Sequence, residues 1–317
     1  MRKSIFAITL LFPALLLGQT EKLTIDDLLG PANGNLFGRG FGGPIQSADG
    51  KFTAAFEDGQ IAIRLSDGGT AKVLTSTHEP KSELALASDG SKVAYISQGQ
   101  VWVVPVAGGE PLELTHDPTG PGDPRGATDH HPQWNPNGKW ILYESGQKGF
   151  NEIYVVCDDG RTLNLLAATE IYHGKDVIAN PGLDHGDAVS SDRFDPRPQW
   201  SPDGKRISYT ERSREYFSGK LKVLPFDQQS GHAAGSAIDV YVAQNDPGGA
   251  WAINTAAWSP DGKTLAVILQ ETHRDKIWTI PDSGSKPKEL TFGEGEDEEP
   301  VYSPDGKWIA RIESRIP

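Results

Sequence analysis

The feature that most constrains this chain is a short turn that recurs along its length. It reads W-S-P-D-G-K at 200–205 and 258–263, and Y-S-P-D-G-K at 302–307; weaker copies stand at 47–51, 87–92 and 134–139. In each full copy, proline presets φ for a type I turn, aspartate tolerates the next position and glycine adopts the left-handed conformation. The motif therefore predicts a tight hairpin turn.

The spacing of these turns predicts the architecture. A short β-rich run follows each turn, such as R-I-S-Y-T at 206–210. Successive turn glycines are 40 to 66 residues apart, at Gly50, Gly90, Gly138, Gly204, Gly262 and Gly306. Repetition at this period, with about four strands per unit, is typical of a β-propeller. Since one such sheet cannot bury both faces, the units must pack side by side in a ring.

We therefore predict an all-β fold, a β-propeller of about six four-stranded blades within one domain, 44–317. The predicted blades span about 44–77, 83–115, 130–168, 197–244, 254–291 and 299–317. The last is incomplete, because only its first two strands precede Pro317. An unpaired hairpin exposes a sheet edge, so we expect either an open ring or a longer protein of which this chain is the N-terminal part. An N-terminal linker, 21–43, precedes the blades, and its L-T-I-D-D-L-L stretch is expected to be helical.

The first residues predict export. Arg2 and Lys3 precede an apolar run, 5–17, that is too short to span a bilayer. This pattern indicates a signal peptide, 1–20, and a periplasmic or secreted protein. A buried N-terminal helix is disfavoured by the basic start and by Pro13. Cys157 is the only cysteine, so the chain has neither an intramolecular disulfide nor a lipid-attachment cysteine near the cleavage site.

The charge of the chain restricts its partners. The formal net charge is −13, and removal of the signal peptide makes it about −15. The sequence has no basic stripe, so a nucleic acid is not expected as a partner. The acidity is consistent with solubility.

The turns, the I-Y-V-V run at 153–156 and the terminal E-L-T at 289–291 together resemble the propeller repeats of two groups of proteins. These are TolB-type proteins and the N-terminal domains of the prolyl oligopeptidase and dipeptidyl peptidase IV family of serine peptidases. The resemblance covers about 44–315. TolB proteins carry a separate α/β domain before the propeller, whereas only about 24 residues separate the signal peptide from the first blade here, which favours the peptidase branch.

The resemblance implies a hydrolase domain with a G-x-S-x-G motif, which this sequence lacks. Ser236 and Ser285 do not have the strand-turn-helix setting that the nucleophile requires. The Glu298-Glu299 pair is expected in a loop and lacks the aromatic pattern of the amine-binding glutamates of dipeptidyl peptidase IV. We therefore expect no catalytic residues, no cofactor and no metal in this chain.

The expected function is peptide or protein binding by a non-catalytic exported propeller. This propeller resembles the substrate-gating domain of these peptidases, and a hydrolase domain is a candidate partner. The alternative is a stand-alone TolB-like periplasmic protein-interaction module. Candidate binding residues lie at equivalent places in two neighbouring units: Arg212, Arg214, Glu215 and Tyr216, and then His273, Arg274 and Asp275. Such charges can bind a partner domain or a peptide carboxylate; a solvated surface without a role is the alternative.

Other polar segments are interpreted as structural. The 168–195 insertion contains His173, His185 and several carboxylates, but in no metal-binding spacing. His130 and His131 point opposite ways in an extended strand, so we expect one packed and one solvated ring. The acidic run 292–299 lacks the register of a calcium loop, and we interpret it as a solvated linker rather than a site for calcium or a cationic peptide.

Two further residue types are assigned to the scaffold. Trp134, Trp200 and Trp258 recur once per unit, so we expect them to pack between blades. Cys157 precedes Asp158 and Asp159, whose charges are expected to raise the pKa of the thiol and make it a poor nucleophile.

Overall fold

The computed structural model describes residues 7–8, 44–47, 50–66, 68–116, 129–145, 152–168, 197–213, 218–243, 253–271 and 274–314. Within these ranges the regular structure is entirely β, with strands β1 to β23 and no helix. The all-β prediction is therefore confirmed. The expected helix in 21–43 lies outside the described residues.

The strands form six antiparallel sheets, which we call blades 1 to 6 in chain order. Blades 1 to 5 contain four strands each, hydrogen-bonded in sequence order. Blade 1 comprises β2 (Ile45–Gln46), β3 (Phe52–Glu57), β4 (Gln60–Leu65) and β5 (Lys72–Val73); blade 2 comprises β6 (Lys81–Leu86), β7 (Lys92–Ser97), β8 (Gln100–Pro105) and β9 (Leu112–Glu113). Blade 3 comprises β10 (Asp129–Trp134), β11 (Trp140–Ser145), β12 (Glu152–Cys157) and β13 (Leu163–Ala168); blade 4 comprises β14 (Gln199–Trp200), β15 (Arg206–Ser213), β16 (Ser218–Pro225) and β17 (Ile238–Val242). Blade 5 comprises β18 (Ile253–Trp258), β19 (Thr264–Glu271), β20 (Arg274–Pro281) and β21 (Lys288–Glu289).

Blade 6 differs from the expected two-stranded unit. It contains β22 (Glu296–Tyr302), β23 (Ile309–Ser314) and a third strand, β1 (Ala7–Ile8), which pairs with the outer edge of β23. Unpaired backbone groups at a sheet edge are a template for another strand, and here the N-terminal residues pair with them. Because β1 lies within the predicted signal peptide, cleavage after residue 20 would remove this strand.

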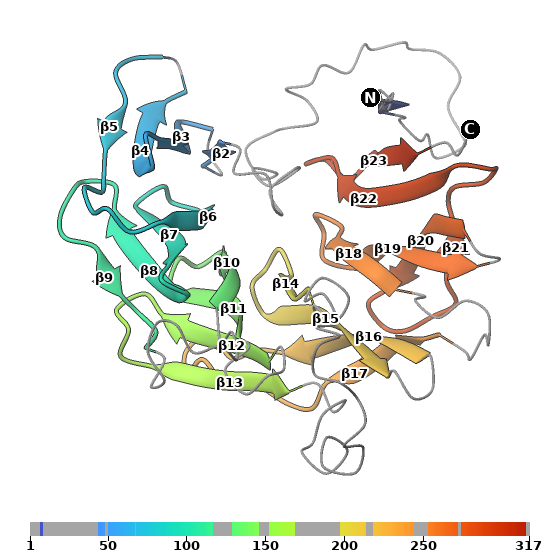
Figure 1. The fold of residues 1–317 in the computed structure, drawn as a ribbon. Helices are drawn as coiled ribbons and strands as arrows, with labels where there is room; N and C mark the ends of the chain where they lie inside the picture. The colour runs from blue at the N-terminus through green and yellow to red at the C-terminus, as the bar shows by residue number, and fades with distance from the viewer. Residues whose placement is uncertain are drawn as a thin grey trace, which may run out of the picture.

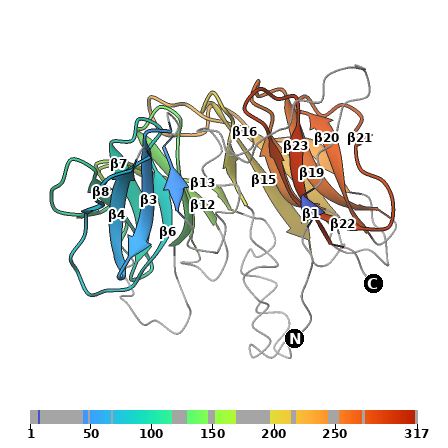
Figure 2. The same cartoon turned by 90° about the horizontal axis from the view of Figure 1, so that it is seen from above.

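The blades follow one another around a central axis, with the first strand of each blade innermost (Figure 1). This arrangement is the predicted β-propeller. Seen from above, the strands run between two faces of the ring (Figure 2). We call them the turn face, which carries the turns between strands one and two and between strands three and four, and the loop face, which carries all other connections.

Hydrogen bonds made by the serine and aspartate of the recurring motif stabilise its turns on the turn face. In blade 4 the Ser201 hydroxyl donates to the Asp203 carboxylate at 2.6 Å, and the same carboxylate accepts the backbone N–H of Lys205 at 3.1 Å. The Gly204 N–H donates to the Ser201 carbonyl at 2.8 Å. Blades 5 and 6 repeat these bonds around Asp261 and Asp305. The hydrogen bonds from Ser303 and Lys307 lower the pKa of Asp305 to about 2.

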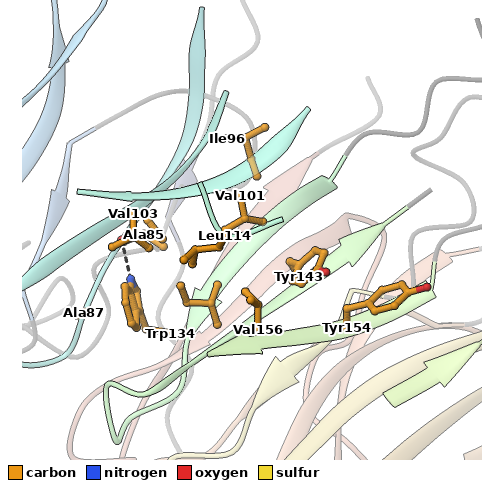
Figure 3. Packing of buried hydrophobic residues seen from close by; sticks show 12 residues of the cluster. Ala85, Ala87, Ile96, Val101, Val103, Leu114, Trp134, Tyr143, Tyr154 and Val156 are labelled. Atoms are coloured by element: carbon orange, nitrogen blue, oxygen red, sulfur yellow. Dashed lines mark hydrogen bonds between the residues drawn. The ribbon is translucent and has the colours of Figure 1, made fainter. Parts of the chain in front are cut away.

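The three predicted packing tryptophans connect neighbouring blades. The indole N–H of Trp134 donates to the Ala85 carbonyl of the preceding inner strand at 3.0 Å. Trp200 donates in the same way to Gln133 at 3.2 Å, and Trp258 to Gln199 at 3.4 Å. Figure 3 shows the Trp134 ring in the apolar cluster between blades 2 and 3. The packing role expected for these residues is confirmed, and each indole also joins two inner strands by a hydrogen bond.

Ion pairs add further contacts between blades at the turn face. Lys92 of blade 2 pairs with Asp158 of blade 3. Arg206 of blade 4 pairs with Asp282 of blade 5, and its guanidinium lies 4.9 Å from the centre of the Trp258 ring. These partly buried contacts add charge complementarity to the apolar packing.

The turn glycines provide a matched test of this packing. Gly138 and Gly204 both have positive φ, at 72° and 66°. A Cβ at Gly138 would meet nothing within 4 Å, whereas a Cβ at Gly204 would lie 2.5 Å from the side-chain amides of Asn135 and Gln228. We expect Gly138→Ala to cost about 1 kcal/mol of unfolding free energy, from backbone strain alone. Gly204→Ala should cost about 2–3 kcal/mol, because the neighbouring amides must also move.

Urea denaturation followed by tryptophan fluorescence measures both values. Equal losses in the two variants would contradict the contact between blades 3 and 4 at the turn face.

Candidate functional site

The inner strands share an irregularity near their loop-face ends. The pairing of β6, β10, β18 and β22 with the following strand is shifted by a bulge. In three of these bulges a non-glycine residue has positive φ, Glu83 at 54°, His131 at 54° and Glu299 at 49°. Arg197, just before β14, has φ 47°. Such backbone conformations are uncommon and concentrate at functional sites.

The bulges of β6 and β10 bring together four side chains that we call the His–Glu cluster: Glu83, His130, His131 and Glu144. One Glu83 oxygen lies 3.2 Å from Nδ1 of His130, and the other accepts the backbone N–H of His131. Nδ1 of His131 lies 3.3 Å from Oε1 of Glu144. Three strands, β6, β10 and β11, therefore meet through ionisable groups at the loop face.

The two histidine rings are not on opposite faces, as an extended strand would place them. Their centres are 6.1 Å apart, because the bulge rotates the backbone between them. The His130 side chain is 43% exposed and that of His131 27%, while Glu144 is almost completely buried. The expectation of one packed and one solvated ring is therefore wrong: both rings are partly accessible and both contact a glutamate.

The electrostatics of Glu83 reflect its partners. Burial raises the pKa of this carboxyl, but the hydrogen bonds from His130 and His131 outweigh burial, and the net pKa is lowered. Glu83 is therefore ionised at neutral pH and can act as a hydrogen-bond acceptor or ion-pair partner. Its two oxygens contact the ring of His130 and the backbone of His131, and these contacts hold β10 against β6.

A buried polar layer lies beside the cluster, between blades 2 and 3. The Thr115 hydroxyl accepts the Val101 N–H at 2.9 Å and donates to the Asp129 carboxylate at 2.6 Å. The Tyr154 hydroxyl donates to Glu152 at 2.6 Å. Burial raises the pKa of Tyr154, and the Glu152 carboxylate raises it further. The bond from Thr115 holds Asp129, the first residue of β10, and the two histidines follow it directly in the chain.

The binding residues predicted from the sequence are only partly described. Arg212 lies in β15 and Arg274 and Asp275 in β20, on hairpins that occupy equivalent places in blades 4 and 5. Arg214, Glu215, Tyr216 and His273 lie outside the described residues. The Arg274 guanidinium donates to the Glu294 carbonyl, so part of its hydrogen-bonding capacity holds the connection to blade 6. Ligand binding by these seven residues stays a prediction.

The acidic run 292–299 is not simply a solvated linker. Its second half is the start of β22, where Asp297 is fully buried and paired with Arg311. Arg311 also donates to Glu313 at 2.9 Å, and Lys276 donates to the Gly295 carbonyl. Burial lowers the pKa of Lys276, and the nearby arginines lower it further. Glu298 and Glu299 are in this strand rather than in a loop, and both are exposed.

Other candidates contribute no site in the described part of the chain. Burial raises the pKa of the Cys157 thiol, and the charges of Asp159 and Asp158 add to the effect, as expected. Among the described side chains, no three of His, Cys, Asp or Glu are arranged to hold a metal ion. The 168–195 insertion has only its first residue in the described ranges. No described helix could cross a membrane.

Sequence reasoning missed Glu83 and the joint position of the two histidines. Three of the four left-handed residues at these strand ends precede proline, at His131-Pro132, Arg197-Pro198 and Glu299-Pro300. A following proline favours an extended backbone for the preceding residue, so this pattern does not predict the left-handed conformation. Glu83 precedes a leucine, and its bulge has no signal in the local sequence either.

Comparison with known proteins agrees with the fold. No protein-family model matches the chain. The chain is 25% identical over 182 residues to a "Protein TolB homolog" of Chlorobium luteolum, which covers 56% of this chain and 32% of that protein. It is 27% identical over 235 residues to "Probable dipeptidyl-peptidase 5" of Aspergillus clavatus, which covers 69% of this chain and 28% of that protein. The chain thus spans about a third or less of the length of these curated relatives.

A solved puromycin-hydrolyzing peptidase of Mycobacterium tuberculosis has a similar fold. Its TM-score is 0.58 at 14% identity, over 89% of this chain and 45% of that one. At this identity the likeness concerns the fold alone. Together with the two sequence relatives, it leads to the conclusion that this chain is a β-propeller whose repeats are similar to those of TolB and dipeptidyl-peptidase proteins.

Proposed function

We propose that this chain is an exported, non-catalytic propeller that binds a peptide or protein ligand at its loop face. The observation that carries the proposal is the difference between the two faces. On the turn face, the turns between the first two strands of blades 4, 5 and 6 are short and are closed by their own serine and aspartate side chains. The loop face contains the bulged inner-strand ends and the partly exposed His130 and His131. Binding residues in general concentrate on such loops above a rigid scaffold.

Two kinds of protein are consistent with this proposal. In the first, the propeller is the part of a dipeptidyl-peptidase-like protein that gates access of peptides to a hydrolase domain. In the second, it is a stand-alone TolB-like module that binds another envelope protein. The peptidase relative covers the larger share of this chain, 69% against 56%, which favours the first. A reading frame that continues beyond Pro317 into a G-x-S-x-G domain would support the gating role, and an unrelated neighbouring gene would support the module.

A binding experiment tests the choice of face. A peptide selected on residues 21–317 from a phage-displayed random library serves as the probe, and its affinity is measured by fluorescence anisotropy. We expect His130→Gln and Arg274→Gln each to weaken binding about tenfold, because each removes one charged contact of roughly 1.5 kcal/mol.

Lys263→Gln is the matched control, because Lys263 is exposed on the turn face. It should leave the affinity unchanged. Binding that survives both loop-face substitutions but is lost in Lys263→Gln would place the ligand on the opposite face and contradict the proposal.

The absence of catalysis is tested separately. The purified chain should not hydrolyse dipeptidyl or puromycin-like amide substrates above the buffer rate, since the sequence contains no G-x-S-x-G nucleophile motif. Hydrolysis that co-purifies with the chain and is abolished by a serine-directed inhibitor would overturn this part of the proposal.

A further inference from the structure

We propose that the His–Glu cluster is a protonation-dependent clamp between blades 2 and 3. When the imidazoles are protonated, His130 pairs with Glu83 and His131 with Glu144, and these pairs hold the loop-face ends of β6, β10 and β11 together. When the imidazoles are neutral, the charge is lost and the ends of these strands open more often. The clamp requires no ligand and so does not depend on the proposed binding function.

The geometry supports a clamp rather than two independent surface pairs. Glu83 lies in the bulge of one inner strand and contacts two consecutive residues in the bulge of the next, the ring of His130 and the backbone of His131. His131 then continues the contact to Glu144, whose side chain is 2% exposed. Exposed ion pairs contribute little to stability, but partly buried and networked pairs are screened less by water and salt.

The other charged groups on the packed strands are engaged in separate contacts. On β6, the Lys81 ammonium donates to the carbonyls of Thr77 and Glu79, at 2.9 Å each. Lys92 of β7 lies at the opposite end of the blade and pairs with Asp158. Asp129 accepts the Thr115 hydroxyl, and Glu152 of β12 accepts the Tyr154 hydroxyl. Tyr143 of β11 has a pKa raised by burial and by Asp129, so it stays neutral.

The titration of the Glu83 carboxyl and that of the two histidine rings set the lower and upper limits of the pH range in which the clamp is closed. The folded-state pKa of Glu83 lies below its ordinary value of 4.5. Its contribution to stability is therefore present above pH 4.5 and is lost as pH falls through the folded pKa. On the other side, only a protonated imidazole forms an ion pair with a carboxylate, so the two pairs weaken as pH rises and the histidines lose their protons. The clamp should be tightest between these limits.

Amide hydrogen exchange of the unliganded full chain tests the proposal. Exchange of the amides in 81–86 and 129–134 is measured at about pH 5.5 and about pH 8, and corrected for the intrinsic dependence of exchange on pH. We expect protection to be about fivefold lower at the higher pH, the size expected from the loss of a modest ion pair. The bulge of β22, at 296–302, contains no histidine and should not respond.

Variants identify the groups responsible. Glu83→Gln keeps a hydrogen-bond acceptor but removes the charge that pairs with His130, so it should reduce the pH response by about half, since the pair of His131 with Glu144 remains. His116→Gln is the matched control: His116 lies 3.2 Å from Glu113, but its side chain is 74% exposed, and the response should persist. Side-chain NMR titration of His130 and His131 in the wild-type chain gives a second readout if Glu83→Gln does not fold. Protection that does not change with pH, or a full response in Glu83→Gln, would overturn the clamp.

Discussion

The structure depends on one repeated contact, the hydrogen bond from an indole N–H to the inner strand of the preceding blade. Trp134, Trp200 and Trp258 donate to the backbone carbonyls of Ala85, Gln133 and Gln199, respectively. Each acceptor lies one residue before the position that is equivalent to the tryptophan in the preceding blade. The ring fills the apolar space between two sheets while the N–H satisfies a backbone carbonyl near the axis. Each contact sets the separation and register of two inner strands, and the three together relate blades 2, 3, 4 and 5.

The register of the inner strands determines which side chains lie at the loop face. In blades 3, 4 and 5 the tryptophan holds the turn-face end of the inner strand, so irregularity can be tolerated at its loop-face end. The bulges of β6 and β10 occur there, and they bring Glu83 to two consecutive histidines. In blade 6 the equivalent end contains Arg311 and Asp297 instead. The same scaffold therefore supports different charged groups at different blades.

The repeats were enough to predict the scaffold from the sequence, and much less of the site could be predicted. Proline, glycine and tryptophan at fixed spacing have local, repeated consequences, so the turns and the packing residues followed from them directly. The joint position of His130 and His131 did not, because it depends on a bulge that reverses the alternation expected of a strand. The acidic run was misjudged for a related reason: the burial of Asp297 depends on Arg311, a cross-strand partner that local composition does not reveal. The pairing of β1 with β23 joins opposite ends of the chain and has no local signal.

The most direct test of the account compares two tryptophans. Trp134→Phe removes the indole N–H that bonds to Ala85, whereas the buried Nε1 of Trp278 has no hydrogen-bond partner among the described residues. Both changes lose a similar volume, but only Trp134→Phe also loses the bond between inner strands, and urea denaturation measures the unfolding free energy of both variants. The account predicts that Trp134→Phe is the more destabilising by about 1 kcal/mol or more. Equal losses, or a larger loss for Trp278→Phe, would contradict it.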